Sequence, residues 1–134
     1  MIVVDTNTIA YLLIPGKETE DVRAALRKDP DWRAPILWRS EFRNVLALMM
    51  RRKGLALEDA MRLMEKAEKM LGNAEYRVPS AQVLALARES GCSAYDCEFV
   101  ALAHELGARL VTSDNAILKA FPDIALAPEA FLDL

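Results

Sequence analysis

Four acidic residues in this chain stand at positions where folded proteins often carry out chemistry. Two of them, Asp5 and Asp114, follow short apolar runs that are predicted to be buried strands. The other two, Glu41 and Asp96, stand just inside segments that are predicted to be helices. In a doubly wound sheet, the carboxyl ends of the strands and the starts of the following helices share one edge. We therefore expect all four carboxylates to converge on one crevice.

A cluster of carboxylates favours a bound divalent cation. Like charges at short range repel and raise one another's pKa, and a cation between them relieves that repulsion. Mg²⁺ prefers oxygen ligands and keeps several waters, so it can activate one water and stabilise a leaving oxygen, as a phosphodiester substrate requires. In the alternative interpretation Asp5 and Asp114 are only helix N-caps, and Glu41 and Asp96 are first-turn acids favoured by the helix dipole.

The segments that would position these acids alternate between strands and helices. Apolar runs predict strands at 2–4, 32–34, 76–78, 109–112 and 124–126. Helical spacing and end signals predict one helix from the Asp5–Asn7 segment to about residue 14, and others at 18–28, 37–53, 57–71, 80–89, 95–106, from 114 to before 122, and from 128. This order predicts an α/β fold, a three-layer α/β/α sandwich with a mainly parallel central sheet. Helices 37–53 and 57–71 should form a protruding hairpin.

Length and composition are those of an ordinary globular domain. The 134 residues fit a single domain spanning 1–134, with 53% hydrophobic and 28% charged residues. No apolar run approaches the roughly 20 residues that cross a bilayer, and no signal peptide is apparent, so we expect a cytoplasmic protein with no membrane partner. Cys92 and Cys97 form no disulfide framework. With His104 as the only histidine, zinc is disfavoured and a hard cation is expected.

Charge and methionine are unevenly distributed along the chain. Residues 23–69 hold twelve of the seventeen Lys and Arg but only seven of the twenty acids. That segment is either a surface for a polyanion or a set of solvated helix faces. Five methionines fall in the predicted hairpin and either fill its core or line an adaptable groove for a partner helix: Met49, Met50, Met61, Met64 and Met70.

Four segments, in order and across the whole chain, resemble a PIN domain. They are Ile2–Asn7, Trp38–Leu46, the Tyr95-Asp96 helix start and Leu110–Asp114. More narrowly, the chain is similar to the VapC-type toxins of bacterial and archaeal toxin–antitoxin pairs. Each motif alone is weak, whereas four in register are specific.

The resemblance implies a Mg²⁺- or Mn²⁺-dependent endoribonuclease, usually a homodimer, that a small antitoxin protein inhibits. The acids that match the family's catalytic and metal-binding positions are Asp5, Glu41, Asp96 and Asp114. Thr6, Asn7 and Ser113 match neighbouring polar positions that orient ligands or waters. At Asn115 the chain departs from many relatives, which carry a basic or acidic residue there, and this leaves open whether one metal ion or two is held.

Other readings of the same pattern are less consistent with particular residues. A receiver-like domain requires paired acids after the first strand and a lysine after a late one, and a haloacid-dehalogenase-type phosphatase requires a second acid where Asn7 stands. The alternatives that stay open are a PIN-like RNA-processing nuclease without an antitoxin and a non-catalytic module that binds RNA or a protein partner. A nuclease assay with metal and with chelator separates catalysis from binding.

Overall fold

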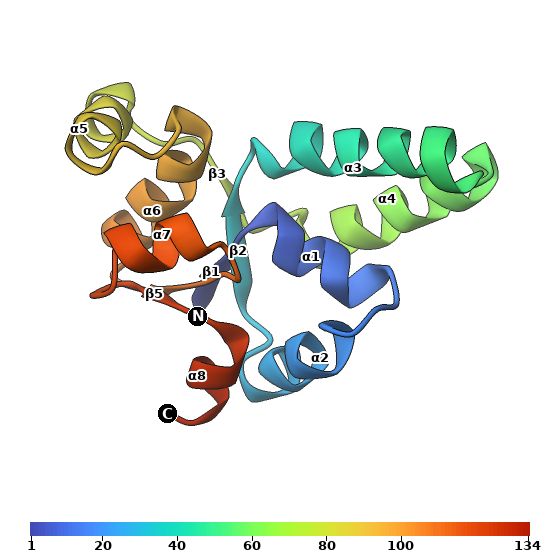
Figure 1. Cartoon of the computed structure of the whole chain (residues 1–134), viewed down its shortest axis with the longest axis horizontal. Helices are drawn as coiled ribbons and strands as arrows, with labels where there is room; N and C mark the ends of the chain where they lie inside the picture. Colours follow the sequence, from blue (N-terminus) through green and yellow to red (C-terminus); the bar gives the residue numbers. More distant parts are fainter.

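The computed structural model describes residues 1–134 and is organised around a sheet of five parallel strands. Figure 1 shows the sheet nearly edge-on, between two groups of helices. Its spatial order is β3-β2-β1-β4-β5. The strands are β1 (Ile2–Val4), β2 (Trp32–Pro35), β3 (Glu75–Tyr76), β4 (Arg109–Val111) and β5 (Ala125–Leu126). This confirms the predicted α/β sandwich, with a sheet that is wholly parallel.

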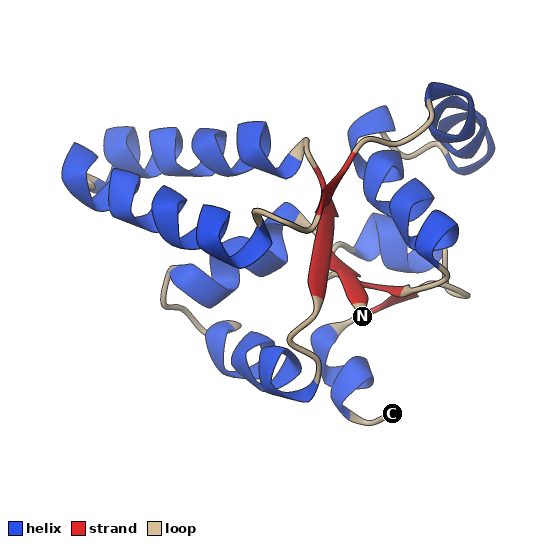
Figure 2. Cartoon of the chain, turned by 180° about the vertical axis from the view of Figure 1, so that it is seen from behind, coloured by secondary structure: helices blue, strands red, loops and turns tan.

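Eight helices connect and flank the strands. They are α1 (Thr6–Leu13), α2 (Thr19–Lys28), α3 (Trp38–Lys53), α4 (Leu57–Leu71), α5 (Ser80–Ser90), α6 (Ala94–Leu106), α7 (Asn115–Ala120) and α8 (Pro128–Leu132). Helices α5, α6 and α7 lie on one side of the sheet, and α1 to α4 lie on the other (Figures 1 and 2). No helix combines the length and the apolar character needed to cross a membrane.

Apolar burial explains why these segments assemble. Strand β1 is fully buried, and a cluster of 25 buried residues links it to the inner faces of the helices. Helix α6 contributes an uninterrupted buried run from Phe99 to Ala103 and packs on β1, β2 and β4. Trp32 and Trp38 are both buried, so they pack in the core and are not displayed on the surface.

The strand order creates a switch point beside β1. From β1 the chain winds outward through β2 to β3, then returns to place β4 on the opposite side of β1. Val4 pairs in register with Val111, so the residues that follow β1 and β4 emerge side by side. Ligands of open α/β sheets bind at the carboxyl ends of strands at such a point.

Helices α3 and α4 run side by side away from the sheet as the predicted protruding hairpin (Figures 1 and 2). Gly54 ends α3 in the left-handed conformation, with φ of 68°, which only glycine adopts at little cost. Met50, Met64 and Met70 pack against the core, whereas Met61 is 54% exposed. Core filling is therefore the main use of the hairpin methionines.

Strand β3 differs from the prediction, which placed it at 76–78. The observed strand is Glu75–Tyr76, because Ala34 donates a backbone hydrogen bond to Ala74 and Ile36 donates one to Tyr76. Strand β2 also extends one residue beyond the predicted range, to Pro35. Register with the neighbouring strand, and not the apolar pattern of residues 76–78, determines where β3 lies.

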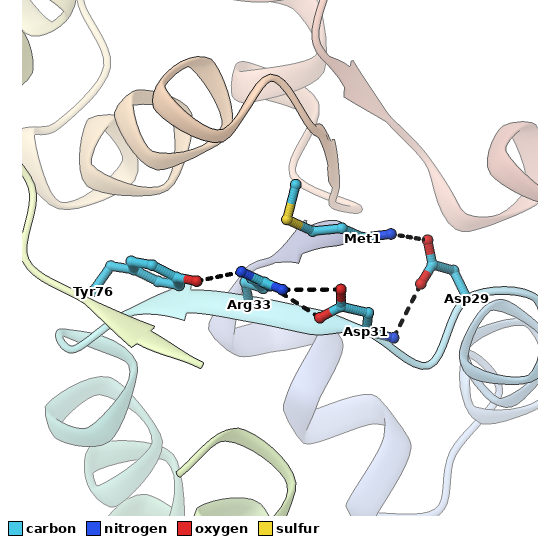
Figure 3. Close-up of polar contacts among 5 residues, drawn as sticks. All are labelled: Met1, Asp29, Asp31, Arg33 and Tyr76. Carbon is cyan, nitrogen blue, oxygen red and sulfur yellow. Dashed lines mark hydrogen bonds and ion pairs between the residues drawn. The ribbon is translucent and has the colours of Figure 1, made fainter. Parts of the chain in front are cut away.

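Acidic side chains along β2 and β3 are paired with bases. Figure 3 shows Arg33 of β2 between Asp31 and Tyr76, with its Nε 2.9 Å from the Asp31 carboxylate. Farther along, Arg39 of α3 binds Glu75 through Nε at 2.6 Å and also pairs with Glu68 of α4. Trp38 Nε1 donates a hydrogen bond of 2.8 Å to Glu75. We call Asp31, Glu68 and Glu75 the paired acids.

Candidate active site

A cleft of about 220 Å³ opens at the carboxyl ends of β1 and β4. Helices α1, α3 and α6 contribute its walls from their N-terminal halves. Nine residues line it: Asp5, Thr6, Asn7, Glu41, Asn44, Val45, Asp96, Phe99 and Asp114. The structure thus brings the four acids that we singled out from the sequence to one cleft, which we call the carboxylate cleft.

Asp5 is the most buried of the four acids, at 7% exposed. Its Oδ1 accepts hydrogen bonds from the Thr8 backbone N–H at 2.9 Å and from Thr8 Oγ1 at 2.7 Å, and so caps α1. Thr112 Oγ1 donates to its Oδ2 from the end of β4. A carboxylate has about four lone-pair sites, so three donors leave about one site free. Asp5 is held rigidly and still has an acceptor site for a cation.

Glu41 and Asp96 enter the cleft from the first turns of two different helices. Glu41 lies in the first turn of α3, and its Oε1 accepts a hydrogen bond of 2.7 Å from Thr6 Oγ1. Asp96 lies in the first turn of α6, where Ser93 is the N-cap and accepts a hydrogen bond of 3.1 Å from the Asp96 N–H. Because Ser93 caps the helix, the Asp96 carboxylate is not needed for that purpose.

Asp114 follows β4 and caps α7 through a hydrogen bond of 3.1 Å from the Ile117 N–H to its Oδ1. Its own N–H donates to Thr112 Oγ1 at 3.0 Å, so the same threonine contacts both Asp114 and Asp5. Asp5 and Asp114 are therefore N-caps as well as cleft residues. Capping uses one oxygen of each carboxylate, so it does not exclude a second role for either acid.

The electrostatic environment opposes ionisation of three of these acids. Burial is the main cause of the raised pKa of Asp5, and Asp114 adds to it. Burial also raises the pKa of Glu41, with contributions from Asp96 and Asp5. The pKa of Asp96 is raised by burial and then by Asp114. No Lys, Arg or His lines the cleft, so nothing in it offsets the concentration of negative charge.

The donor set suits a hard divalent cation. The four acids supply only oxygen, which Mg²⁺ and Mn²⁺ prefer. Burial, and after it repulsion from neighbouring acids, raises the pKa of Glu41 and of Asp96, and a cation would relieve that repulsion. In the conformation described, no three acidic, cysteine or histidine side chains stand close enough together to hold an ion. The fit rests on the chemistry of the donors and not on a preformed coordination shell.

The polar neighbours named from the sequence have different surroundings. Thr6 holds Glu41, whereas Asn7 is exposed at the rim and Ser113 makes no side-chain hydrogen bond. Sequence reasoning missed Thr8 and Thr112, which hold Asp5. Thr8 carries a usable signal, because an N-cap accepts from the backbone N–H of the third residue after it. The role of Thr112 can be identified only from the register of β1 and β4, which the sequence alone does not give.

Comparison with known proteins gives concordant results. The family model of the PIN domain matches residues 2–123. The chain is 30% identical to Ribonuclease VapC3 of Pyrobaculum aerophilum over 90% of its length and 95% of that protein. The crystal structure of PAE2754 from Pyrobaculum aerophilum superposes with a TM-score of 0.78, at 22% identity over 98% of this chain and 93% of that one. A toxin–antitoxin complex from Klebsiella pneumoniae gives 0.69, at 19% identity over 96% and 98%.

Proposed function

Because this chain belongs to the PIN domain family, as a VapC-type member, we propose that it is a metal-dependent endoribonuclease that cuts RNA phosphodiester bonds. The relative that it matches at 30% identity is named a ribonuclease. The observation that carries the proposal is the carboxylate cleft, in which four acids meet at the switch point of the sheet without a single base among them.

In this proposal Asp5, Glu41, Asp96 and Asp114 are the catalytic and metal-binding residues. A bound Mg²⁺ or Mn²⁺ would supply an activated water and positive charge for the leaving oxygen. Thr8 and Thr112 fix the orientation of Asp5, and Thr6 fixes that of Glu41, so these ligands lose little freedom when they bind. Val45 and Phe99 are the two apolar residues that line the cleft.

We further propose that the chain is the toxin of a toxin–antitoxin pair. A solved structure that shares its fold is a toxin–antitoxin complex. An antitoxin that reaches the carboxylate cleft should carry basic side chains, because the only charged side chains that line the cleft are acids. Blocking the cleft in this way would stop both metal binding and RNA entry.

A homodimer is also part of the proposal. Ile36 and Leu84 are 46% and 64% exposed and line an apolar groove of about 420 Å³ together with Val78 and Val83. Covering such a groove with a second copy removes apolar surface from water. Mass measurement by light scattering, with Leu84→Glu as the disrupting variant, tests it: a wild-type protein that is monomeric at all concentrations would refute the dimer.

The decisive experiment is an RNA cleavage assay on the purified chain. We expect cuts in single-stranded RNA with Mg²⁺ or Mn²⁺, and none after exhaustive chelation, with activity restored by added metal. Cleavage that persists in chelator refutes the metal mechanism. RNA binding without cleavage under any metal would assign the chain to the non-catalytic class of binding modules.

A further inference from the structure

A second concavity, of similar volume, adjoins the carboxylate cleft. It has a volume of about 230 Å³ and is lined by Leu37, Ser40, Glu41, Asn44 and Tyr95. It shares Glu41 and Asn44 with the carboxylate cleft, so the two are neighbours. We call it the side pocket. A strand whose phosphate lies among the acids would pass one of its bases over this pocket.

Tyr95 is the unusual member of the side pocket. It is 63% exposed, and it is the only one of the nine aromatic residues that is exposed. It belongs to neither apolar core cluster and makes no side-chain hydrogen bond. It directly precedes Asp96 in the first turn of α6. The fold therefore gains little from this ring, although displaying it in water is unfavourable.

The other lining groups complement the ring. Leu37 is half-buried and offers apolar contact. Ser40 and Asn44 lie one turn apart on α3, are exposed, and have no hydrogen-bond partner within the chain. A planar aromatic face next to unpartnered hydroxyl and amide groups matches a nucleobase, which has a π-face to stack and an edge to hydrogen-bond.

We propose that the side pocket holds one unstacked nucleobase next to the cleaved phosphate, with Tyr95 stacked on the base and Ser40 and Asn44 facing its edge. The inference rests on the proposed ribonuclease function and gives a physical reason for a single-stranded or looped RNA substrate, because a base within a helix cannot leave its neighbours without cost. Tyr95 is then a substrate-binding residue that determines where the chain cuts.

The test is a double-mutant cycle between the protein and the RNA. Wild type, Tyr95→Ala and Tyr95→Phe act on a short single-stranded oligoribonucleotide, and on copies with an abasic residue at each position in turn. Leu57→Ala is the matched control, since Leu57 is 59% exposed and lies at the far tip of the hairpin. Binding of the same oligonucleotides is measured with Ca²⁺ in place of Mg²⁺.

Tyr95→Ala should lower kcat/KM by about 5- to 150-fold, the range for removing an aromatic ring that stacks on a base. Tyr95→Phe keeps the ring and should retain nearly all activity, as should Leu57→Ala. An abasic residue at one position should lower kcat/KM of the wild type by a similar factor. The same abasic residue should lower kcat/KM of Tyr95→Ala little further.

Three results would overturn the inference while leaving the nuclease intact: unchanged cleavage by Tyr95→Ala, fully additive effects of the variant and the abasic residues, or a change in oligomeric mass that places the ring in a subunit interface. A wild type that binds RNA but never cleaves refutes the proposed function, and the binding cycle then still decides the side pocket. A wild type that does neither refutes both.

Discussion

Two sets of acids lie on either side of the first turn of α3. On one side Glu41 enters the carboxylate cleft with Asp96 and no basic neighbour. On the other side Arg39 holds Glu75 and Glu68. The pKa of Glu41 is raised, mainly by burial, whereas the pKa of Glu75 is lowered, mainly by its hydrogen bonds from Arg39.

The contrast separates acids that stabilise the fold from acids that do not. Each paired acid exchanges water for a cationic donor, which favours the folded state. Each cleft acid loses water and gains like-charged neighbours, which disfavours it. Arrangements of the second kind are typical of functional sites, where stability is sacrificed for activity. The difference can be tested by exchanging single atoms in matched acids of the two sets.

The largest expected effect is loss of cleavage when a cleft acid becomes an amide. Asp5→Asn and Asp96→Asn should lower RNA cleavage by orders of magnitude, because each removes a charge that the cation requires. The fold should survive, since the amide oxygen introduced by Asp5→Asn still caps α1 and Ser93 caps α6. Cleavage rates and circular dichroism measure the two parts. The control is Asp31→Asn among the paired acids, and full activity in the Asp5→Asn variant would reduce Asp5 to a cap.

Next in size is the loss of stability when a paired acid becomes an amide. Glu75→Gln should lower the free energy of unfolding by about 1–3 kcal/mol, because the half-buried Arg39 loses one of its two charged partners. The matched change Glu41→Gln should leave that free energy unchanged or raised, while it abolishes cleavage. Urea unfolding measures both variants. If Glu41→Gln proved as destabilising as Glu75→Gln, the distinction between the two sets would fail.

A smaller effect is expected from added metal. Mg²⁺ that binds only the folded chain should stabilise the wild type by about 1.4 kcal/mol at roughly ten times its dissociation constant. Asp5→Asn should respond far less, and Glu75→Gln as much as the wild type. Melting curves across a Mg²⁺ series record the shift. Equal responses in all three proteins would place the ion outside the carboxylate cleft.

The smallest effect is an opposite dependence of stability on pH. The raised native pKa values of Asp5, Glu41 and Asp96 mean that these acids bind more protons in the folded chain than in the unfolded one. Their contribution to the free energy of unfolding is therefore lost as pH rises above the ordinary values near 3.8 and 4.5. Glu75, whose pKa is lowered, contributes stability that is lost as pH falls below 4.5. In metal-free buffer between about pH 4 and about pH 7, the free energy of unfolding of Asp5→Asn should increase relative to that of the wild type as pH rises. A constant difference would contradict this.

Sequence signals predict most of the fold because they are local. Helix ends at Gly54 and Gly107 follow from the left-handed conformation that each adopts after its helix. The buried strand at Ile2–Val4 follows from its β-branched run. Strand β3 is misplaced in the prediction because two residues carry no pattern of their own, and only hydrogen bonds with β2 define them.

Only part of the candidate site could be predicted from the sequence. Acids at strand ends and helix starts converge in any doubly wound sheet, which is why the gathering of Asp5, Glu41, Asp96 and Asp114 could be anticipated. The threonine at 112 could not be assigned to Asp5, because the two residues are 107 positions apart. The side pocket depends on how closely α3 approaches α6, a distance that no local pattern encodes.

The long sequence separation of Asp5 and Thr112 has a consequence for synthesis of the chain on the ribosome. Synthesis proceeds at about 5–20 residues per second, so Asp5 emerges about 5 to 20 s before Thr112. Until β4 docks against β1, Asp5 lacks one of its three hydrogen-bond donors and Asp114 is absent from the cleft. With the proposed nuclease function, a nascent chain of this topology would therefore be unable to cut the RNA around it until its last strands are made. A ribosome-stalled chain ending at residue 106 that cut RNA would disprove this.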